Sequence, residues 1–327
     1  METKRPTIVA AEEILGGYFP VLDHGFVSLV DYMGSDEDIE RAARVSYGYG
    51  TRKVSQTRGL IRYLRRHKHT TPSEMVEFKF HCAMPMFVAR QWIRHRTASV
   101  NEYSGRYSLM PLLFYRPQAD QFALQSSSNR QGRAVASAPE DLYADAIKRW
   151  EELRAKAADT YGWLVDEDVA RELARIDLPL STYTQWYWKI DLHNLIHFLT
   201  LRVDPHAQWE IQQFARVMAG MLQRVAALSY EAWIDYDLLG DRLTFAERRA
   251  LGHFLEGAED ELRVKPDATP LAKDDLKELG LMPREVRELF DKLDPPERPD
   301  FSLDLTAMQS AQQIAALMEA AVPGEDD

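Results

Sequence analysis

The chain has 327 residues, of which 45% are hydrophobic and 28% are charged, and it carries a formal net charge of -11. This composition is typical of a soluble globular protein with a sizeable core, organised as one large domain or as one domain with an appendage. The negative charge argues against sequence-independent binding of DNA or RNA polymers, because that binding draws its affinity from neutralising many phosphates.

The cysteine content and the N-terminus indicate a compartment. The single cysteine, Cys82, excludes an internal disulfide framework and a zinc site built from cysteines, and it is compatible with a reducing cytoplasm. The first residues, METKRPTIVAAEEILGG, lack the continuous apolar segment of a secretory signal, and no apolar run approaches the length of a membrane span. We therefore expect a cytoplasmic protein without a membrane partner.

The chain begins with a predicted strand and two helices. The segment HGFVSLVDYMG indicates a strand that ends at Gly34, and Ser35 with Asp38 then resembles a helix cap. This first helix ends near Ser46. A second helix is expected from Lys53 to His67, with its arginines turned mostly towards water.

A capped turn and a strand follow. Thr71, Pro72 and Glu74 have the form of a helix start, and VEFKFHCAM alternates apolar and polar residues as a half-buried strand does. Cys82 falls on the apolar side of that strand, where it is expected to fill the core. The nearby histidines bracket a helix end and a turn, so we expect no metal site.

An arginine-rich stretch, RQWIRHRTASVNEYSGRYS, comes next. Arg90 and Arg94 stand four apart, so they would share one face of a helix that begins after Pro85. From Thr97 to Gly105 the small and polar residues predict a loop whose backbone N–H groups and hydroxyls could hold an anion. The alternative is a solvated, salt-bridged helix end.

The middle of the chain contains an irregular segment and then regular elements. Residues 115–139 lack periodicity and could form a loop over a site. A long helix is expected over Glu140–Leu164, and a shorter one ends near Arg175 and Ile176. The aromatic, β-branched segment STYTQWYWKI then predicts a strand.

Two helices close the main body. Asp191 can cap the helix LHNLIHFLTLRV, on which His193 and His197 share one face, and DPHAQWEIQQFARVMAGMLQRVAAL forms the next helix. After Gly240, charged helical segments, expected over Thr244–Glu256 and Lys273–Leu293, alternate with proline-rich pieces. We therefore expect a domain over 1–240 and a helical C-terminal extension of unknown role over 241–327.

The motif of Arg94, His95 and Arg96, followed after seven residues by Ser104, resembles the signature of the flavin-dependent thymidylate synthases, the ThyX family. Further segments resemble the family in the expected order: VSLVDYMG, RAARVSY, HKHTTPSEMVEF and LTLRVDPHAQWEIQQFA. The resemblance extends over about Gly25 to Tyr236 and leaves the C-terminal part outside it.

The resemblance implies an α+β subunit with a central antiparallel or mixed sheet flanked by long helices. It implies an enzyme that uses FAD, 5,10-methylenetetrahydrofolate and NADPH to convert dUMP to dTMP. It also implies a homotetramer in which the active sites are shared between subunits.

The family's site residues carry over where the motifs align. The residues implied to bind dUMP are Gln91, Arg94, Glu102, Ser104, Gly105, Arg106, Arg175 and Arg202. Those implied to contact FAD are Ser46, His69, Thr71, Arg94, His95, Arg96, Thr97, Glu102, Asp191, His193 and His197. Asp191 departs from the family pattern, because asparagine is frequent at its position.

The chemistry singles out Arg202 as the catalytic residue. A guanidinium beside O2 and N3 of the pyrimidine would favour the ring form that carries negative charge, which makes C5 more reactive. The alternative is a structural ion pair of Arg202 with Asp204 or Glu210. We expect His95 and Arg96 to stand as cations beside the flavin.

Cys82 is a poor candidate for the thiolate that folate-only thymidylate synthases add to the uracil ring, because nothing near it in the sequence would lower its pKa. No enzyme cysteine nucleophile is therefore expected. Ser104 has no neighbouring base, so positioning of the substrate is its expected role. Two other hypotheses stay open: a non-catalytic protein that binds nucleotides or RNA, and a family member that serves another pyrimidine.

Overall fold

The computed structural model describes residues 6–45, 57–126, 132–258, 261–265, 267–294 and 296–322. The chain forms two compact units. The first combines Met1–Glu231 with Phe301–Asp327, and the second is Ala232–Asp300. From the sequence we expected one C-terminal extension over 241–327, whereas Phe301–Asp327 belongs to the first unit.

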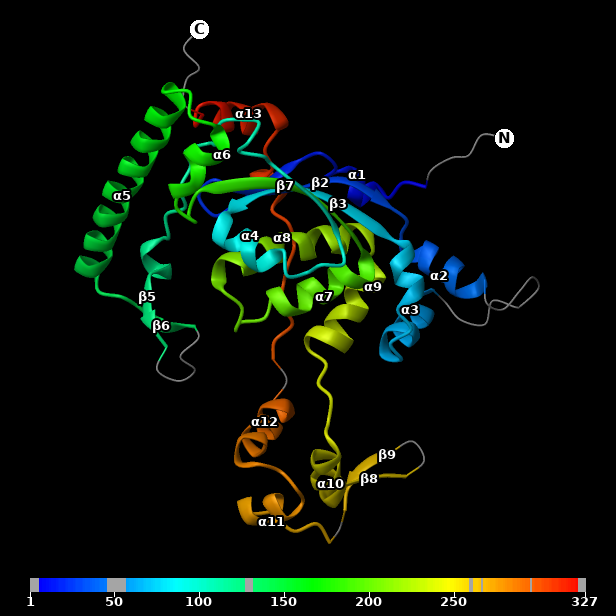
Figure 1. Ribbon diagram of the computed structural model, residues 1–327. Coiled ribbons are helices and arrows are strands. Elements are labelled where there is room, and N and C mark those ends of the chain that lie inside the picture. The colour runs from blue at the N-terminus through cyan, green and yellow to red at the C-terminus, as the bar shows by residue number, and fades with distance from the viewer. Residues whose placement is uncertain are drawn as a thin grey trace, which may run out of the picture. The chain divides into compact units, whose positions relative to one another are not determined.

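A five-stranded sheet forms the centre of the first unit (Figure 1). Its strands are β1 (Tyr18–Val21), β2 (Gly25–Met33), β3 (Glu77–Pro85), β4 (Ser99–Glu102) and β7 (Tyr183–Asp191). They lie in the order β1-β2-β3-β7-β4, and every neighbouring pair is antiparallel. The expected α+β class is confirmed, and the sheet is antiparallel rather than mixed.

The remaining elements of the first unit are mostly helices. The α-helices are α1 (Val9–Glu12), α2 (Asp36–Val45), α3 (Thr57–Arg66), α4 (Met86–Trp92), α5 (Glu140–Asp166), α6 (Arg171–Ala174), α7 (Leu192–Arg202), α8 (Trp209–Val225) and α13 (Ala311–Glu319). Helix α9 (Ala227–Trp233) runs from the first unit into the second. In its described residues the first unit also has four 3-10 turns and a hairpin: η1 (Thr71–Met75), η2 (Ala119–Gln121), η3 (Arg175–Asp177), η5 (Leu305–Ala307), β5 (Ala123–Gln125) and β6 (Arg133–Ser137).

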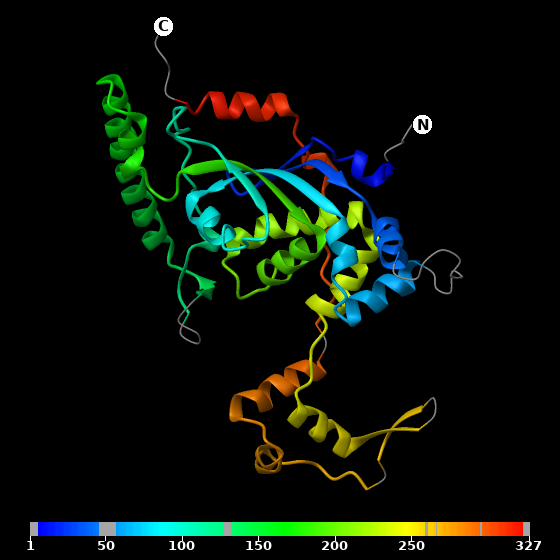
Figure 2. The ribbon, with the colours of Figure 1, turned by 45° about the vertical axis from the view of Figure 1, so that its right-hand side comes forward.

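Helices cover both faces of the sheet. Helices α4, α7 and α8 pack on one face, and α13 lies across the other (Figures 1 and 2). The alternation predicted for β3 is confirmed, because Phe78, Phe80 and Cys82 are fully buried. In the sheet register Cys82 lies between Val27 and Trp186.

Several element boundaries differ from the sequence predictions. The helix expected from Lys53 is described from Thr57 onward, and Ser46 lies outside the described residues. The helix that precedes the arginine motif ends at Trp92. Residues 99–102, expected to belong to a loop, form the edge strand β4, because their backbone pairs with β7 although all four residues are exposed.

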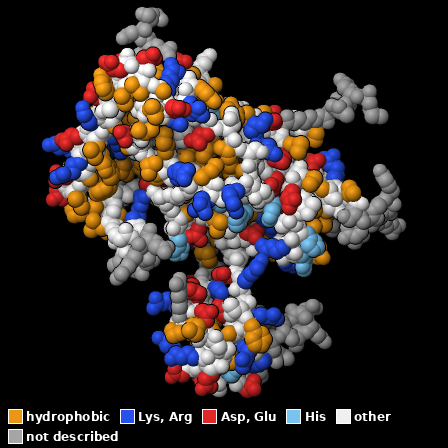
Figure 3. Space-filling model, viewed as in Figure 1, with side chains coloured by type: hydrophobic (Ala, Val, Ile, Leu, Met, Phe, Trp, Pro, Cys, Tyr) orange, Lys and Arg blue, Asp and Glu red, His pale blue; other side chains and the backbone are white. Residues whose placement is uncertain are grey.

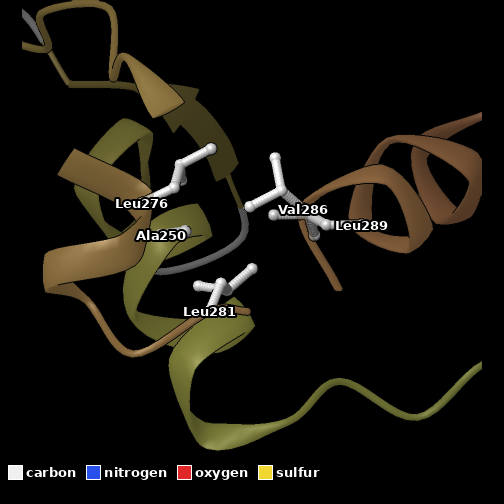
Figure 4. Close-up of a cluster of buried hydrophobic side chains, with 5 residues drawn as sticks. All are labelled: Ala250, Leu276, Leu281, Val286 and Leu289. Atoms are coloured by element: carbon white, nitrogen blue, oxygen red, sulfur yellow. The ribbon is translucent and has the colours of Figure 1, made fainter. Parts of the chain in front are cut away.

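In its described residues the second unit consists of helices and a hairpin. Its elements are the π-helical turn η4 (Ile234–Leu238), α10 (Phe245–Phe254), β8 (Leu255–Ala258), β9 (Glu261–Val264), α11 (Lys273–Glu278) and α12 (Pro283–Leu293). A small core holds it together, in which the side chains of Ala250, Leu276, Leu281, Val286 and Leu289 meet (Figure 4). The single long helix expected over 273–293 is divided in two at Gly280, whose φ is 102°.

Among the helices that the structure describes, none combines the length and the apolar character that crossing a membrane requires.

Candidate active site

The arginine motif leaves the core at a fixed point because Trp92 anchors the end of α4. The Trp92 ring lies 5.4 Å from the ring of Trp186, 5.3 Å from Trp188 and 5.0 Å from Phe198. Trp92 is fully buried, so this cluster joins α4 to β7 and α7. The turn that carries Arg94, His95 and Arg96 is therefore held beside α7.

A pocket of about 430 Å³ opens between this turn and α7. Its lining residues are Arg94, His95, Arg96, Thr97, Ile190, Asn194, His197, Leu201 and Arg202. Figure 3 shows basic and histidine side chains gathered on the face of the first unit that carries α4 and α7. Six of the predicted site residues thus share one pocket: Arg94, His95, Arg96, Thr97, His197 and Arg202.

Arg202 and His95 form a hydrogen bond inside the pocket. The Arg202 Nε donates to His95 Nε2 at 3.0 Å, so the histidine accepts at this nitrogen and is neutral. Burial, reinforced by the charge of Arg202, lowers the pKa of His95 to about 4. The expectation that His95 is a cation is therefore wrong. The positive charge of the pocket belongs to its arginines.

The alternative of a structural ion pair for Arg202 is not observed. Glu210 is bound by Arg133 at 2.8 Å to each carboxylate oxygen, and Asp204 accepts from His206. Arg202 instead lines the pocket and contacts His95. Burial lowers its pKa, but a guanidinium starts so far above neutral pH that it keeps its charge.

The N-terminus of α7 forms one end of this site. Asp191 caps the helix, as predicted: its Oδ1 accepts from the Asn194 backbone N–H at 3.0 Å, and its Oδ2 accepts from the Asn194 amide at 2.7 Å. His193 Nδ1 is buried and has no hydrogen-bond partner among the described residues. Burial and the nearby charge of Arg65 lower the pKa of His193, which favours its neutral form.

The predicted residues before β3 lie near the same helix. The turn η1, which begins at Thr71, packs against α7. His69 precedes η1, and its ring lies 5.9 Å from the ring of Tyr63. Turn η1 therefore lies beside the helix that lines the pocket.

These features fit a large anionic cofactor such as FAD. Guanidinium groups supply the positive charge that a diphosphate requires, and neutral histidines can hydrogen-bond to a polar ring system. The buried His193 Nδ1 is a polar atom that a ligand group could satisfy. The residues that would hold FAD here are Arg94, His95, Arg96, His193 and His197.

A second cluster surrounds the turn Ser104–Arg106. The Ser104 hydroxyl accepts from the Arg106 backbone N–H at 3.3 Å. A Cβ at Gly105 would lie 2.6 Å from Met110 Sδ and 3.0 Å from Arg175 Cδ, so a larger residue there would have to displace these side chains. The turn and Arg175, which the sequence predicted to share a ligand, are thus close together.

Charge at this turn is already partly compensated. Arg106 Nε lies 2.9 Å from a Glu172 oxygen, and both side chains are more than half exposed. An exposed pair of this kind contributes little stability, so a phosphate could take the place of Glu172. Sequence reasoning missed Glu172, because no motif links it to the turn.

The remaining described residues that were predicted to bind dUMP are Gln91 and Glu102. Glu102, at the end of β4, accepts from the Thr184 hydroxyl at 2.8 Å. The Gln91 amide on α4 donates to Gln208. Sequence reasoning missed Gln208 and the pocket residue Asn194. For Asn194 a signal existed, because it lies three residues after the predicted cap Asp191.

Cys82 is unsuited to nucleophilic catalysis. Its side chain is completely buried, and burial raises the pKa of its thiol well above the usual value. In the described parts of the chain, no three His, Cys, Asp or Glu side chains gather as a metal site would require.

Known proteins resemble this chain over most of its length. The family described as "Thymidylate synthase complementing protein" matches residues 28–227. A flavin-dependent thymidylate synthase of Gluconobacter oxydans (strain 621H) is 56% identical over 243 residues, which cover 72% of this chain and 78% of that protein. One from Ehrlichia ruminantium (strain Gardel) is 46% identical over 293 residues, which cover 89% of this chain and 93% of that protein.

A solved structure shares the fold. The UMP/dUMP methylase PolB from Streptomyces cacaoi, bound with 5-Br UMP, superposes with a TM-score of 0.61 at 32% identity and covers 67% of this chain and 98% of its own. The chain belongs to the flavin-dependent thymidylate synthase family.

Proposed function

We propose that this protein converts dUMP to dTMP in the cytoplasm. The one-carbon unit would come from 5,10-methylenetetrahydrofolate and the reducing equivalents from NADPH, leaving tetrahydrofolate and NADP⁺. Bound FAD would supply the hydride that completes the methyl group. The observation that carries the proposal is the pocket in which the Arg94–Arg96 turn meets Arg202.

In this proposal Arg202 activates the pyrimidine. Its guanidinium, fixed through Nε by His95, keeps its two terminal nitrogens for the ring oxygen and nitrogen. Positive charge held there stabilises negative charge that develops on the ring as C5 reacts. Because Cys82 is buried, this electrostatic route replaces the addition of a thiolate.

The other predicted residues would bind and orient the ligands. The turn of Ser104, Gly105 and Arg106, together with the adjacent Arg175, would bind the dUMP phosphate, with Arg106 exchanging Glu172 for phosphate. Gln91, Arg94 and Glu102 would complete the dUMP site. The residues proposed to hold FAD are Ser46, His69, Thr71, Arg94, His95, Arg96, Thr97, Glu102, Asp191, His193 and His197.

We also propose a homotetramer with shared active sites. Large apolar side chains lie exposed on α5 and on the segment after it, among them Trp163, Ile176 and Leu180, which are 59%, 69% and 62% exposed. Apolar surface of this kind is commonly buried by self-association.

The role of Arg202 can be tested by Arg202→Ala. We expect the variant to keep its yellow FAD but to lose dTMP formation by about 100-fold or more, because a charge that stabilises the transition state is gone. Arg149→Ala removes an exposed arginine from α5 and should match the unaltered protein. Turnover of dUMP by Arg202→Ala near the unaltered rate would refute the assignment.

A wider substrate range is the second candidate, because the similar PolB structure is named as a methylase of both UMP and dUMP. Assays that compare UMP with dUMP as the substrate test whether the enzyme accepts both. Formation of 5-methyl-UMP at a comparable rate would support the wider range.

A further inference from the structure

The C-terminal segment Phe301–Val322, here called the C-terminal strap, returns from the second unit and packs along the first. It lies outside residues 28–227, which match the family. Tyr18 and Gln309 exchange backbone hydrogen bonds of 3.0 and 2.7 Å. Gly17 leaves the space that the Met308 side chain fills, since a Cβ there would overlap it.

Helix α13 then crosses the sheet on the face away from α7 and α8 (Figure 2). A capping box between Ser310 and Gln313 starts the helix. Ile314 packs with Phe26 and Ala83 in a buried cluster that Tyr18 and Met318 border. These contacts fix the direction in which the strap leaves the sheet.

The described end of the strap contacts the segment that follows the Ser104–Arg106 turn. The Leu112 backbone N–H donates to the Ala321 carbonyl at 2.8 Å. The Val322 side chain packs against an apolar cluster of Leu109, Met110, Tyr161 and Ala174. The last described residue of the chain therefore helps to close this cluster.

The same cluster supports the turn. Met110 is 2% exposed, and its backbone N–H donates to the Tyr161 hydroxyl at 2.9 Å. Its sulfur lies so close to Gly105 that a Cβ there would come within 2.6 Å of it, and one of the two would have to shift. In a close-packed contact of this kind, a displacement of Met110 is transmitted to Gly105 and to the neighbouring Arg175.

We propose that the C-terminal strap positions the Ser104–Arg106 turn for the phosphate of the substrate, with Val322 as a positioning residue. This inference rests on the proposed role of the turn in binding dUMP. Val322 acts through Met110 and Gly105, and it touches no ligand itself.

The test uses Val322→Asp in the full-length protein, because a carboxylate cannot remain in an apolar cluster at low cost. We expect the KM for dUMP to rise about tenfold while kcat at saturating dUMP and the FAD content are unchanged. Hydrogen exchange of residues 103–112 in the ligand-free protein should accelerate. Val322→Ile should have the same KM for dUMP and the same exchange rate as the unaltered protein. Val322→Ala, a milder change, should raise both quantities, as Val322→Asp does.

The matched control is Leu317→Asp, which places the same charge on an exposed position of α13. We expect it to leave the KM and the exchange unchanged. If Val322→Asp and Val322→Ala leave the KM and the exchange as they are, or if Leu317→Asp alters both equally, the inference is wrong. The unaltered protein could also fail to bind dUMP while hydrogen exchange in Val322→Asp is still accelerated. That result would refute the proposed function but not the strap's contact with the turn.

Discussion

His95 has a defined protonation state because burial and the neighbouring Arg202 both act on it. Arg202 donates to its Nε2, and burial together with the arginine's charge lowers its pKa to about 4. A protonated His95 could not accept this bond and would stand beside a cation. The histidine of the motif therefore orients Arg202 and leaves the charge to the arginines.

This protonation state predicts how stability depends on pH. A histidine whose folded pKa lies below its usual 6.5 stabilises the fold above that value, and the stabilisation is lost as the pH falls from 6.5 towards 4. His95→Gln keeps an acceptor without a titrating ring. We expect the variant to lose less unfolding free energy than the unaltered protein over this range, by about 1 kcal/mol after allowance for solvent screening.

Urea unfolding at pH 7 and pH 5 measures this difference. His206→Gln serves as the control, because its ring is 85% exposed and lies outside the pocket. An equal loss of stability in His95→Gln and in the unaltered protein would show that His95 is not buried as a neutral ring.

At the scale of elements, an aromatic cluster and a helix cap position the site. Trp92 joins α4 to β7 and α7, so the arginine turn and Arg202 approach each other from two helices. Asp191 starts α7 and so fixes where His193 and His197 lie along it. The aromatic cluster and the helix cap therefore hold the pocket residues at constant separation.

The cap at Asp191 makes a prediction about α7. Asp191→Asn should change the free energy of unfolding by no more than about 0.5 kcal/mol, because asparagine caps as well as aspartate does. Asp191→Ala should lose about 1 kcal/mol, because the Asn194 backbone N–H loses its acceptor. Chemical denaturation of the three proteins gives these values. A loss in Asp191→Asn as large as in Asp191→Ala would show that the charge of Asp191 matters more than its cap.

The sequence predicted those elements whose signal is local. The alternation in β3 and the cap at Asp191 both follow from neighbouring residues, and both are confirmed. Strand β4 could not be predicted, because all four of its residues are exposed and only its pairing with β7 defines it. The neutral state of His95 likewise depends on Arg202, which is 107 residues away.

At the scale of the molecule, the chain's division into units also depends on distant contacts. The change of composition after Gly240 indicated an appendage, but Phe301–Asp327 returns to the first unit. The apolar residues of α13 are too few to show from sequence which surface they cover. Their partners, such as Phe26 and Ala83, lie more than two hundred residues earlier.

The proposed assembly can be tested by mixing two inactive variants. Arg202→Ala and Arg106→Ala would each inactivate a different part of the site. If each active site takes these arginines from different subunits, random mixed tetramers should recover about a quarter of the activity. Gel filtration should give about 150 kDa, four times the 37.6 kDa chain. Mixed tetramers as inactive as the separate variants would mean that one subunit supplies both arginines.

We infer that the chain makes dTMP from dUMP with FAD and without an enzyme thiolate. The most direct test of this inference is dTMP formation by the purified protein before removal of FAD, after removal, and after FAD is added back, with 5,10-methylenetetrahydrofolate and NADPH present. We predict that activity disappears with the flavin and returns with it. Formation of dTMP by the flavin-free protein, or the absence of dTMP formation by the reconstituted protein, would refute a flavin-dependent synthesis of dTMP.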